Sequence, residues 1–435
     1  MIHKGELMKA QNLLEFFSKI AARGGIIVFF IMAFEVMIMI SPFAFFFYSV
    51  FNPVLHWLDS YSATSWLTTF FLPHMILPPT NFLKAIRIMG SAFFIVGAGT
   101  FTICALQVYL GKIMRWGIAG RGLYGAIRHP QYLALGLWGV GMSILWPRFL
   151  VLASLSLMLI LYYFLAKNEE GRMLKLFGDS YRRYMERTGM FLPHEIEARL
   201  SAPLGFFQNN ALKYAVITLG LPILIIGSGF LLREVTLGSL PFQARGNMTL
   251  VSILPEDDIL SRKVIEELFP VSGGHTQLPF FNSDKDYLGY VMPPDYVMQG
   301  MIANTGDEFH LHKQQHTFAL ITDWVLNPFE HLRRSPAAEM AKMRNVDPAM
   351  ARRHHCPLGI NDVNLQCQTC PYRRIIFLEA GHNGKARLSK EGLLSLDVIR
   401  VPVGFIDINT QTGEIINAKK VEKATAWRDV PTPAI

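Results

Sequence analysis

One long apolar run constrains the fold of this chain more than any other feature. It extends from Leu133 to Leu165 and is broken only at Trp146-Pro147-Arg148. The run is too long for an ordinary core helix, and the proline at its middle interrupts helical hydrogen bonding. We therefore predict a helical hairpin that dips into a bilayer and returns on the same side.

The polar segments that flank this run would meet at one membrane face. The segment before the run contains Arg128-His129, and the segment after it contains Glu169-Glu170. Both segments are rich in groups that can hold a charged ligand. A site assembled from them would be half aqueous and half lipid.

Composition supports a membrane setting. Hydrophobic residues make up 51% of the 435 residues and charged residues only 17%, although this length leaves room for a soluble domain as well. The net charge of +8 is concentrated around the hydrophobic segments, which fits anionic lipid headgroups. Because no basic stripe with interleaved aromatic residues is present, we expect no nucleic-acid partner.

The other hydrophobic segments complete a helical membrane domain. Residues 1–24 form a basic amphipathic lead-in that differs from a cleaved signal peptide. Further spans are predicted at 25–50, 88–110 and 214–232, and the proline-rich segment 51–86 is predicted to be an interfacial connector. Together with the hairpin, these segments give about five spans.

The basic loops predict the orientation of this domain. Lys and Arg residues crowd the N-terminus and the two polar segments beside the hairpin, so these parts should be cytoplasmic. We therefore predict an α-helical polytopic membrane domain at 25–235, in a bacterial inner membrane. Residues 236–435 should then form a soluble α+β domain outside the cytoplasm.

The predicted soluble domain mixes helices and strands. A hairpin is expected in the sequence GFIDINTQTGEII because apolar and polar residues alternate around a turn that contains glycine. The other predicted elements are an acidic helix at 256–268, helices at 312–326 and 336–343, and strands at 374–378 and 398–408.

The polar segments beside the hairpin carry an ordered series of motif residues. In chain order these are Gly122, Tyr124, Arg128-His129-Pro130, Tyr132, Glu169-Glu170, Phe177-Gly178, Tyr181, Tyr184 and Pro193. The series, at about residues 105–195, resembles the isoprenylcysteine carboxyl methyltransferase family and its bacterial phospholipid-methyltransferase relatives. No counterpart of the last 200 residues is recognised.

This resemblance implies a membrane-embedded S-adenosylmethionine site at the cytosolic face. The family frames its cofactor with a His-Pro segment and an acidic pair, and Arg172 stands where the family often has a basic or polar residue. The positions that match the cofactor-binding segments are His129, Pro130, Tyr132, Glu169 and Glu170.

The residue types suit this cofactor independently of the resemblance. S-adenosylmethionine carries a sulfonium, an ammonium, a carboxylate, a ribose diol and an adenine, so its site needs both signs of charge and a flat apolar slot. Arg128 or Arg172 can bind the carboxylate, and the acidic pair can bind the ammonium or the diol. The aromatic residues that can flank the adenine or face the sulfonium are Tyr124, Tyr132, Tyr181 and Tyr184.

The methyl acceptor is predicted to be lipid-like or attached to a lipid. A carboxylate or thiolate acceptor needs no general base, whereas an amine acceptor must arrive unprotonated. His129 is the candidate base for an amine. We therefore predict catalytic roles for His129 and Arg172.

Each of these residues also has a purely structural interpretation. An Arg-His-Pro sequence at a helix entrance can anchor lipid headgroups and start a helix. The acidic pair can be a solvated helix face, and tyrosines are common at membrane boundaries. The joint order of the motif residues favours a cofactor site over these separate explanations.

A second cluster of possible ligands lies in the predicted outer domain. His355, Cys356, Cys367 and Cys370 have spacing that can close a zinc site or hold an iron-sulfur centre. Outside the cytoplasm, however, two of these cysteines could instead form a disulfide. The sequence leaves both interpretations open.

The sequence thus predicts an S-adenosylmethionine-dependent membrane methyltransferase fused to a soluble domain of unknown role. The alternative is a structural or metal-binding subunit of a larger membrane complex, in which a methyltransferase-like scaffold is retained without catalysis. The additional domain keeps this alternative open, because it could bind a membrane protein partner.

Overall fold

The computed structural model divides the chain into two compact units. A helical unit comprises Met1–Met39 and Arg87–Leu231, and a sheet unit comprises Ile40–Ile86 and Leu232–Ile435. Within them, the structure describes residues 24, 30, 53–74, 76–114, 121–201, 210–268, 278, 280–282, 284–293, 302–303, 322, 325–333, 372–382, 389–395 and 398–421.

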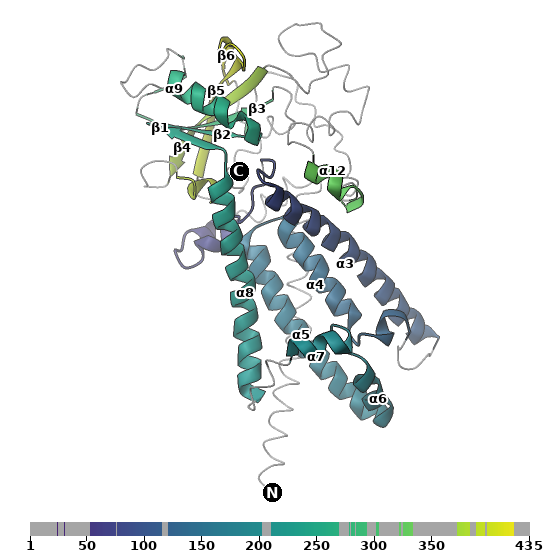
Figure 1. Ribbon diagram of the computed structural model, residues 1–435. Coiled ribbons are helices and arrows are strands. Elements are labelled where there is room, and N and C mark those ends of the chain that lie inside the picture. Colours follow the sequence, from purple (N-terminus) through teal and green to yellow (C-terminus); the bar gives the residue numbers. More distant parts are fainter. Residues whose placement is uncertain are drawn as a thin grey trace. The chain divides into compact units, whose positions relative to one another are not determined.

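Long helices dominate the first half of the chain (Figure 1). The first turns of α3 and the last turns of α8 belong to the sheet unit, and the remainder belongs to the helical unit. The helices are α3 (Asn81–Ile113), α4 (Pro130–Leu145), α5 (Phe149–Phe177), α6 (Asp179–Arg187), α7 (His194–Ser201) and α8 (Asn210–Ser239).

Helices α3 and α4 pack backbone to backbone. A Cβ atom on Gly97 would lie 2.4 Å from the backbone nitrogen of Trp138, and one on Gly141 would lie 2.4 Å from that of Phe94. No side chain fits at either position. Such close packing through small residues is typical of helices that associate in membranes.

The predicted helical hairpin is present. Helix α4 ends at Leu145 and α5 begins at Phe149, so the turn falls on Trp146-Pro147-Arg148, as the sequence indicates. Both Trp146 and Arg148 are buried, and the guanidinium carbon of Arg148 lies 5.4 Å from the centroid of the Trp146 ring. The hairpin turn is therefore a packed structure rather than a loose loop.

Three of the described helices are long and apolar enough to cross a membrane: Asn81–Val108, Phe149–Phe177 and Tyr214–Ser239. The first contains the predicted span 88–110 except for its last two residues, and the third contains the predicted span 214–232 and extends beyond it. The second is the second arm of the hairpin. The first arm, α4, has only 16 residues. The predicted lead-in 1–24 and span 25–50 lie outside the described residues, except for residues 24 and 30.

The sheet unit contains six strands in the order β1-β2-β3-β4-β5-β6. Neighbouring strands are antiparallel except for β2 and β3, which are parallel. The strands are β1 (Phe242–Arg245), β2 (Met248–Ser252), β3 (Tyr287–Met292), β4 (Tyr372–His382), β5 (Val398–Asn409) and β6 (Ile415–Lys420). Helix α9 (Asp258–Leu268) packs against β1 and β2, and a short helix α12 spans Pro328–Arg333.

The described part of the sheet unit agrees with the predicted α+β class. The acidic helix at 256–268 is α9 with the 3-10 turn before it, and the predicted strands at 374–378 and 398–408 are parts of β4 and β5. Strands β5 and β6 form the predicted hairpin, in whose turn Gly413 has a positive φ of 77°. The helices predicted at 312–326 and 336–343 lie outside the described residues, except for 322, 325 and 326.

The connector packs within the sheet unit. The Phe70 nitrogen donates to the Leu394 carbonyl at 3.0 Å, and the Leu77 nitrogen donates to the Ile253 carbonyl at 3.4 Å. The Thr236 hydroxyl, near the end of α8, donates to the Phe71 carbonyl at 3.0 Å. The connector therefore joins the end of α8 and the sheet in one packed body.

Candidate functional site

The site begins where α4 begins. Pro130 occupies the first turn of α4, where its missing N–H costs nothing, and His129 precedes it. The Arg128 nitrogen donates to the Gly189 carbonyl at 2.8 Å, and the His129 nitrogen donates to the Met190 carbonyl at 3.0 Å. These bonds join the segment before α4 to the segment after α6.

The Arg128 side chain connects three elements. Its Nε donates to Glu170 Oε1 at 2.6 Å, and both side chains are buried. Its Nη1 donates to the Met185 carbonyl at 3.1 Å and to the Thr188 carbonyl. Arg128 thus fastens the start of α4 to the end of α5 and to α6. Most of its donors are used in doing so.

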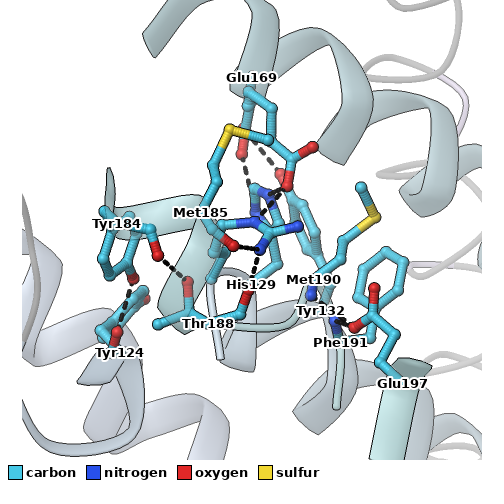
Figure 2. Close-up of polar contacts among 12 residues, drawn as sticks. Tyr124, His129, Tyr132, Glu169, Tyr184, Met185, Thr188, Met190, Phe191 and Glu197 are labelled. Atoms are coloured by element: carbon cyan, nitrogen blue, oxygen red, sulfur yellow. Dashed lines mark hydrogen bonds and ion pairs between the residues drawn. The ribbon is translucent and has the colours of Figure 1, made fainter. Parts of the chain in front are cut away.

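His129 lies between the two acids of the pair. Figure 2 shows it with Glu169. Its Nδ1 is 3.5 Å from Glu169 Oε2, and its Nε2 is 3.7 Å from Glu170 Oε1. The Nε2 atom is buried without a hydrogen-bond partner. The hairpin has therefore brought together the two polar segments that the sequence predicted would meet.

Three aromatic rings continue from His129 into the hairpin. The His129 and Tyr132 rings are stacked with centroids 5.5 Å apart, and the Tyr132 and Tyr162 rings are stacked with centroids 4.9 Å apart. The Tyr132 hydroxyl donates to Glu169 Oε1 at 2.8 Å. This stack of aromatic rings connects the acids to the apolar interior of the hairpin.

A second group of tyrosines lies beside this network. The Tyr184 hydroxyl donates to the Tyr124 carbonyl at 2.6 Å, and the Tyr124 hydroxyl contacts Gln131 Oε1. The rings of Tyr181 and Tyr184 have centroids 5.6 Å apart. Burial raises the pKa of Tyr184 to about 12 and also raises the pKa values of Tyr124 and Tyr181. All three phenols therefore remain protonated near neutral pH.

Glu197 of α7 is part of the site, although no motif in the sequence indicates it. Its Oε2 accepts hydrogen bonds from the backbone nitrogens of Met190 and Phe191 at 2.5 and 3.1 Å (Figure 2). It also accepts one from the backbone nitrogen of Leu192 at 3.4 Å. The Phe191 ring in turn lies 6.1 Å from the His129 ring, centroid to centroid. A pattern search cannot find such a residue, because its partners are backbone groups.

Arg172 stands apart from the buried network. It is exposed near the end of α5, and among the described residues it has no ion-pair partner. It follows Glu170 by two residues on the same helix. Arg172 is therefore a cation at the edge of the site that is available to a ligand.

The predicted metal ligands belong to a part of the chain that the structure does not describe. His355, Cys356, Cys367 and Cys370 all lie outside the described residues. Among the residues that the structure does describe, no group of three or more His, Cys, Asp or Glu side chains could hold a metal ion. The described cysteine, Cys104, is a buried free thiol.

Comparison with known proteins supports the resemblance over part of the chain. A segment of 75 residues is 31% identical to protein-S-isoprenylcysteine O-methyltransferase of Schizosaccharomyces pombe. This segment is 17% of the present chain and 31% of the yeast protein, so the chain spans less than a third of that relative's length. No family model matches the chain. No solved structure matches it either.

Proposed function

We propose that this protein is an integral-membrane, S-adenosylmethionine-dependent methyltransferase that acts on a lipid-like or lipid-attached acceptor. One observation carries the proposal. The apolar hairpin brings His129, at the start of one arm, between Glu169 and Glu170, at the end of the other. The partial similarity to a methyltransferase supports the same conclusion.

The residues present fit the charges of this cofactor. Arg128 already donates to Glu170 and to two backbone carbonyls, so we assign it to holding the acid in place. The exposed Arg172 is then the better partner for the cofactor carboxylate. Glu169, whose side chain is 31% exposed, can accept a hydrogen bond from the ammonium or the ribose diol.

S-adenosylmethionine supplies an electrophilic methyl group on a sulfonium. The stacked rings of His129, Tyr132 and Tyr162 lie next to the acids, and an aromatic face at the end of this stack favours a cation. Methyl transfer is a direct displacement, so the residues around it contribute by aligning the acceptor and excluding water. The buried hairpin side of the site suits both tasks, because an acceptor with a lipid tail can approach from the apolar side.

The surroundings of His129 favour a carboxylate or thiolate acceptor. Each of its ring nitrogens faces a carboxylate oxygen, at 3.5 and 3.7 Å, so neither is directed at an incoming amine. A carboxylate or thiolate needs no base, and His129 can then serve to orient the acidic pair. An amine acceptor would require a base, and neither His129 nitrogen is directed at such an acceptor.

We place the site at the cytosolic face and the sheet unit outside the cytoplasm of a bacterial inner membrane. The basic residues around α6 support the cytosolic position of the site. Helix α8 is long enough to cross a membrane, and its end packs with the connector and the sheet. The connector and the sheet should therefore share the opposite face.

Titration of the full-length protein in detergent with S-adenosylmethionine tests the proposal. We expect micromolar binding by calorimetry, and at least a hundredfold loss in Glu170→Ala, because the change leaves Arg128 buried without its acid. Glu170→Gln, which keeps an oxygen for Arg128, should retain the fold and still bind weakly. Glu186→Ala, an exposed acid on α6, is the matched control and should bind like the wild type.

Absence of binding by the wild-type protein would overturn the proposal. If the purified protein also contained stoichiometric zinc or iron, the result would favour the alternative of a non-catalytic subunit of a membrane complex. Substitution of the predicted metal ligands in the sheet unit would then be the next experiment.

A further inference from the structure

We propose that Glu197 is a positioning residue that holds the turn at residues 189–192 against His129 and so shapes the cofactor site. The inference rests on the proposed function, since it concerns the same site. It adds a residue on α7 that lies after the last motif position, Pro193, and that contacts none of the predicted site residues directly.

The carboxylate of Glu197 organises the turn from one side. Three successive backbone N–H groups, those of residues 190, 191 and 192, converge on its Oε2. Successive amides that point to one spot form a concave anion-binding arrangement. Without an acceptor there, three partly buried donors would lose their partners, and the turn would lose its present conformation.

Gly189 shows how tightly this turn is folded. A Cβ atom at this position would lie 1.8 Å from the Leu192 carbonyl oxygen and 2.7 Å from Glu197 Oε2. Backbone cannot yield as a flexible side chain does, so only glycine fits. The turn and the carboxylate are therefore packed against each other at the same point.

The other side of the turn is bonded to the site. The carbonyls of Gly189 and Met190 accept from the backbone nitrogens of Arg128 and His129. The Phe191 ring contacts the His129 ring. A change in the turn must therefore change the position of His129 relative to the acidic pair, although Glu197 itself does not touch that pair.

The remainder of α7 provides a control. Glu197 is partly buried, whereas its neighbours Glu195 and Ile196 are exposed. Glu195 has the same charge on the same short helix and makes no hydrogen bond or ion pair with the described residues. Its removal should test whether the charge of α7, rather than the contact made by Glu197, matters.

Affinity for S-adenosylmethionine in the full-length, detergent-solubilised protein is the readout. We expect Glu197→Ala to weaken binding about tenfold or more. Glu197→Gln should restore most of the affinity, because its side-chain oxygen can accept the same N–H groups. The shorter Glu197→Asp should fall between them, and Glu195→Ala should match the wild type. Equal affinities for the Glu197 variants and the wild type would overturn the inference.

A double-mutant cycle tests whether Gly189 and Glu197 act through the same turn. If Gly189→Ala and Glu197→Ala both act through the turn, the losses should not add. The double variant should then bind the cofactor about as well as whichever single variant has the lower affinity. Additive losses would contradict a shared route. Failure of the wild type to bind the cofactor would instead refute the proposed function. Normal wild-type binding with an unaffected Glu197→Ala would refute the role of Glu197 alone.

Discussion

Each unit of this protein buries an arginine against a carboxylate, but the two pairs are built differently. In the sheet unit, Arg374 and Asp407 are both 1% exposed and make two parallel contacts, Nε to Oδ1 at 2.7 Å and Nη2 to Oδ2 at 3.0 Å. In the helical unit, Arg128 contacts Glu170 through Nε alone.

The surroundings of the two pairs differ in the same way. Asn417 donates to Asp407 Oδ2 at 3.0 Å, and the Arg374 guanidinium lies 4.4 Å from the centroid of the Phe405 ring. That network is closed by protein on all the sides that the structure describes. In contrast, the network of Glu170 continues to His129, whose Nε2 has no hydrogen-bond partner, and to the partly exposed Glu169.

The same kind of ion pair can therefore stabilise a fold or contribute to a binding site. A buried pair with every polar atom satisfied can hold a fold together, and it has nothing left to offer a ligand. A pair whose network ends in a partly exposed carboxylate, that of Glu169, still has an acceptor to offer a ligand. The completeness of the network, rather than the residue types, distinguishes structure from site.

The largest predicted effect is on the closed pair. Arg374→Met should destabilise the sheet unit by about 3–5 kcal/mol, because it leaves the Asp407 charge buried without its partner. Differential scanning calorimetry of the full-length protein measures this loss. Affinity for S-adenosylmethionine at a temperature below the transition should not change.

The double variant Arg374→Met with Asp407→Leu controls for the loss of packing. It removes both charges, so it should recover most of the stability that the single variant loses. A fall in cofactor affinity in either folded variant would contradict the distinction between the two pairs.

The sequence predicted that the polar segments would meet, but not which hydrogen bonds and ion pairs they would form. The length of the apolar run and its break at residues 146–148 suffice to bring Arg128-His129 to Glu169-Glu170. They do not reveal that the carbonyls of Met185 and Thr188 turn toward Arg128. From the sequence alone, Arg128 and Arg172 are therefore equal candidates for the cofactor carboxylate.

Other features escaped prediction for related reasons. Glu197 binds backbone N–H groups, so its role depends on the conformation of the turn after Gly189 rather than on any pattern of residue types. Strand β1 has only four residues. All six residues of β3 are buried, so it lacks the alternation that indicates a strand.

A smaller effect is expected at the open edge of the site. Arg172→Ala should weaken S-adenosylmethionine binding about tenfold to a hundredfold, because one charge-assisted contact to the carboxylate is lost. The thermal unfolding midpoint should barely move, since Arg172 is exposed and has no ion-pair partner among the described residues.

Arg187→Ala, which removes an exposed arginine from α6, is the matched control and should leave the affinity unchanged. If Arg172→Ala binds like the wild type whereas Arg128→Lys loses binding without unfolding, the carboxylate role would pass to Arg128. Arg128 would then be a ligand-binding residue, and not one that only holds Glu170 in place.

The smallest effect concerns the Tyr132 hydroxyl, which joins the stack of aromatic rings to the acids. Tyr132→Phe removes the 2.8 Å hydrogen bond to Glu169 but keeps the stacking with His129 and Tyr162. Water can replace the hydroxyl, because the Glu169 side chain is 31% exposed. The loss in cofactor affinity should therefore be about 1 kcal/mol, or about fivefold, by calorimetry. Tyr132→Leu also removes the ring and should cost more. Equal losses in the two variants would mean that the hydroxyl, and not the stacked ring, is what this open network presents to its ligand.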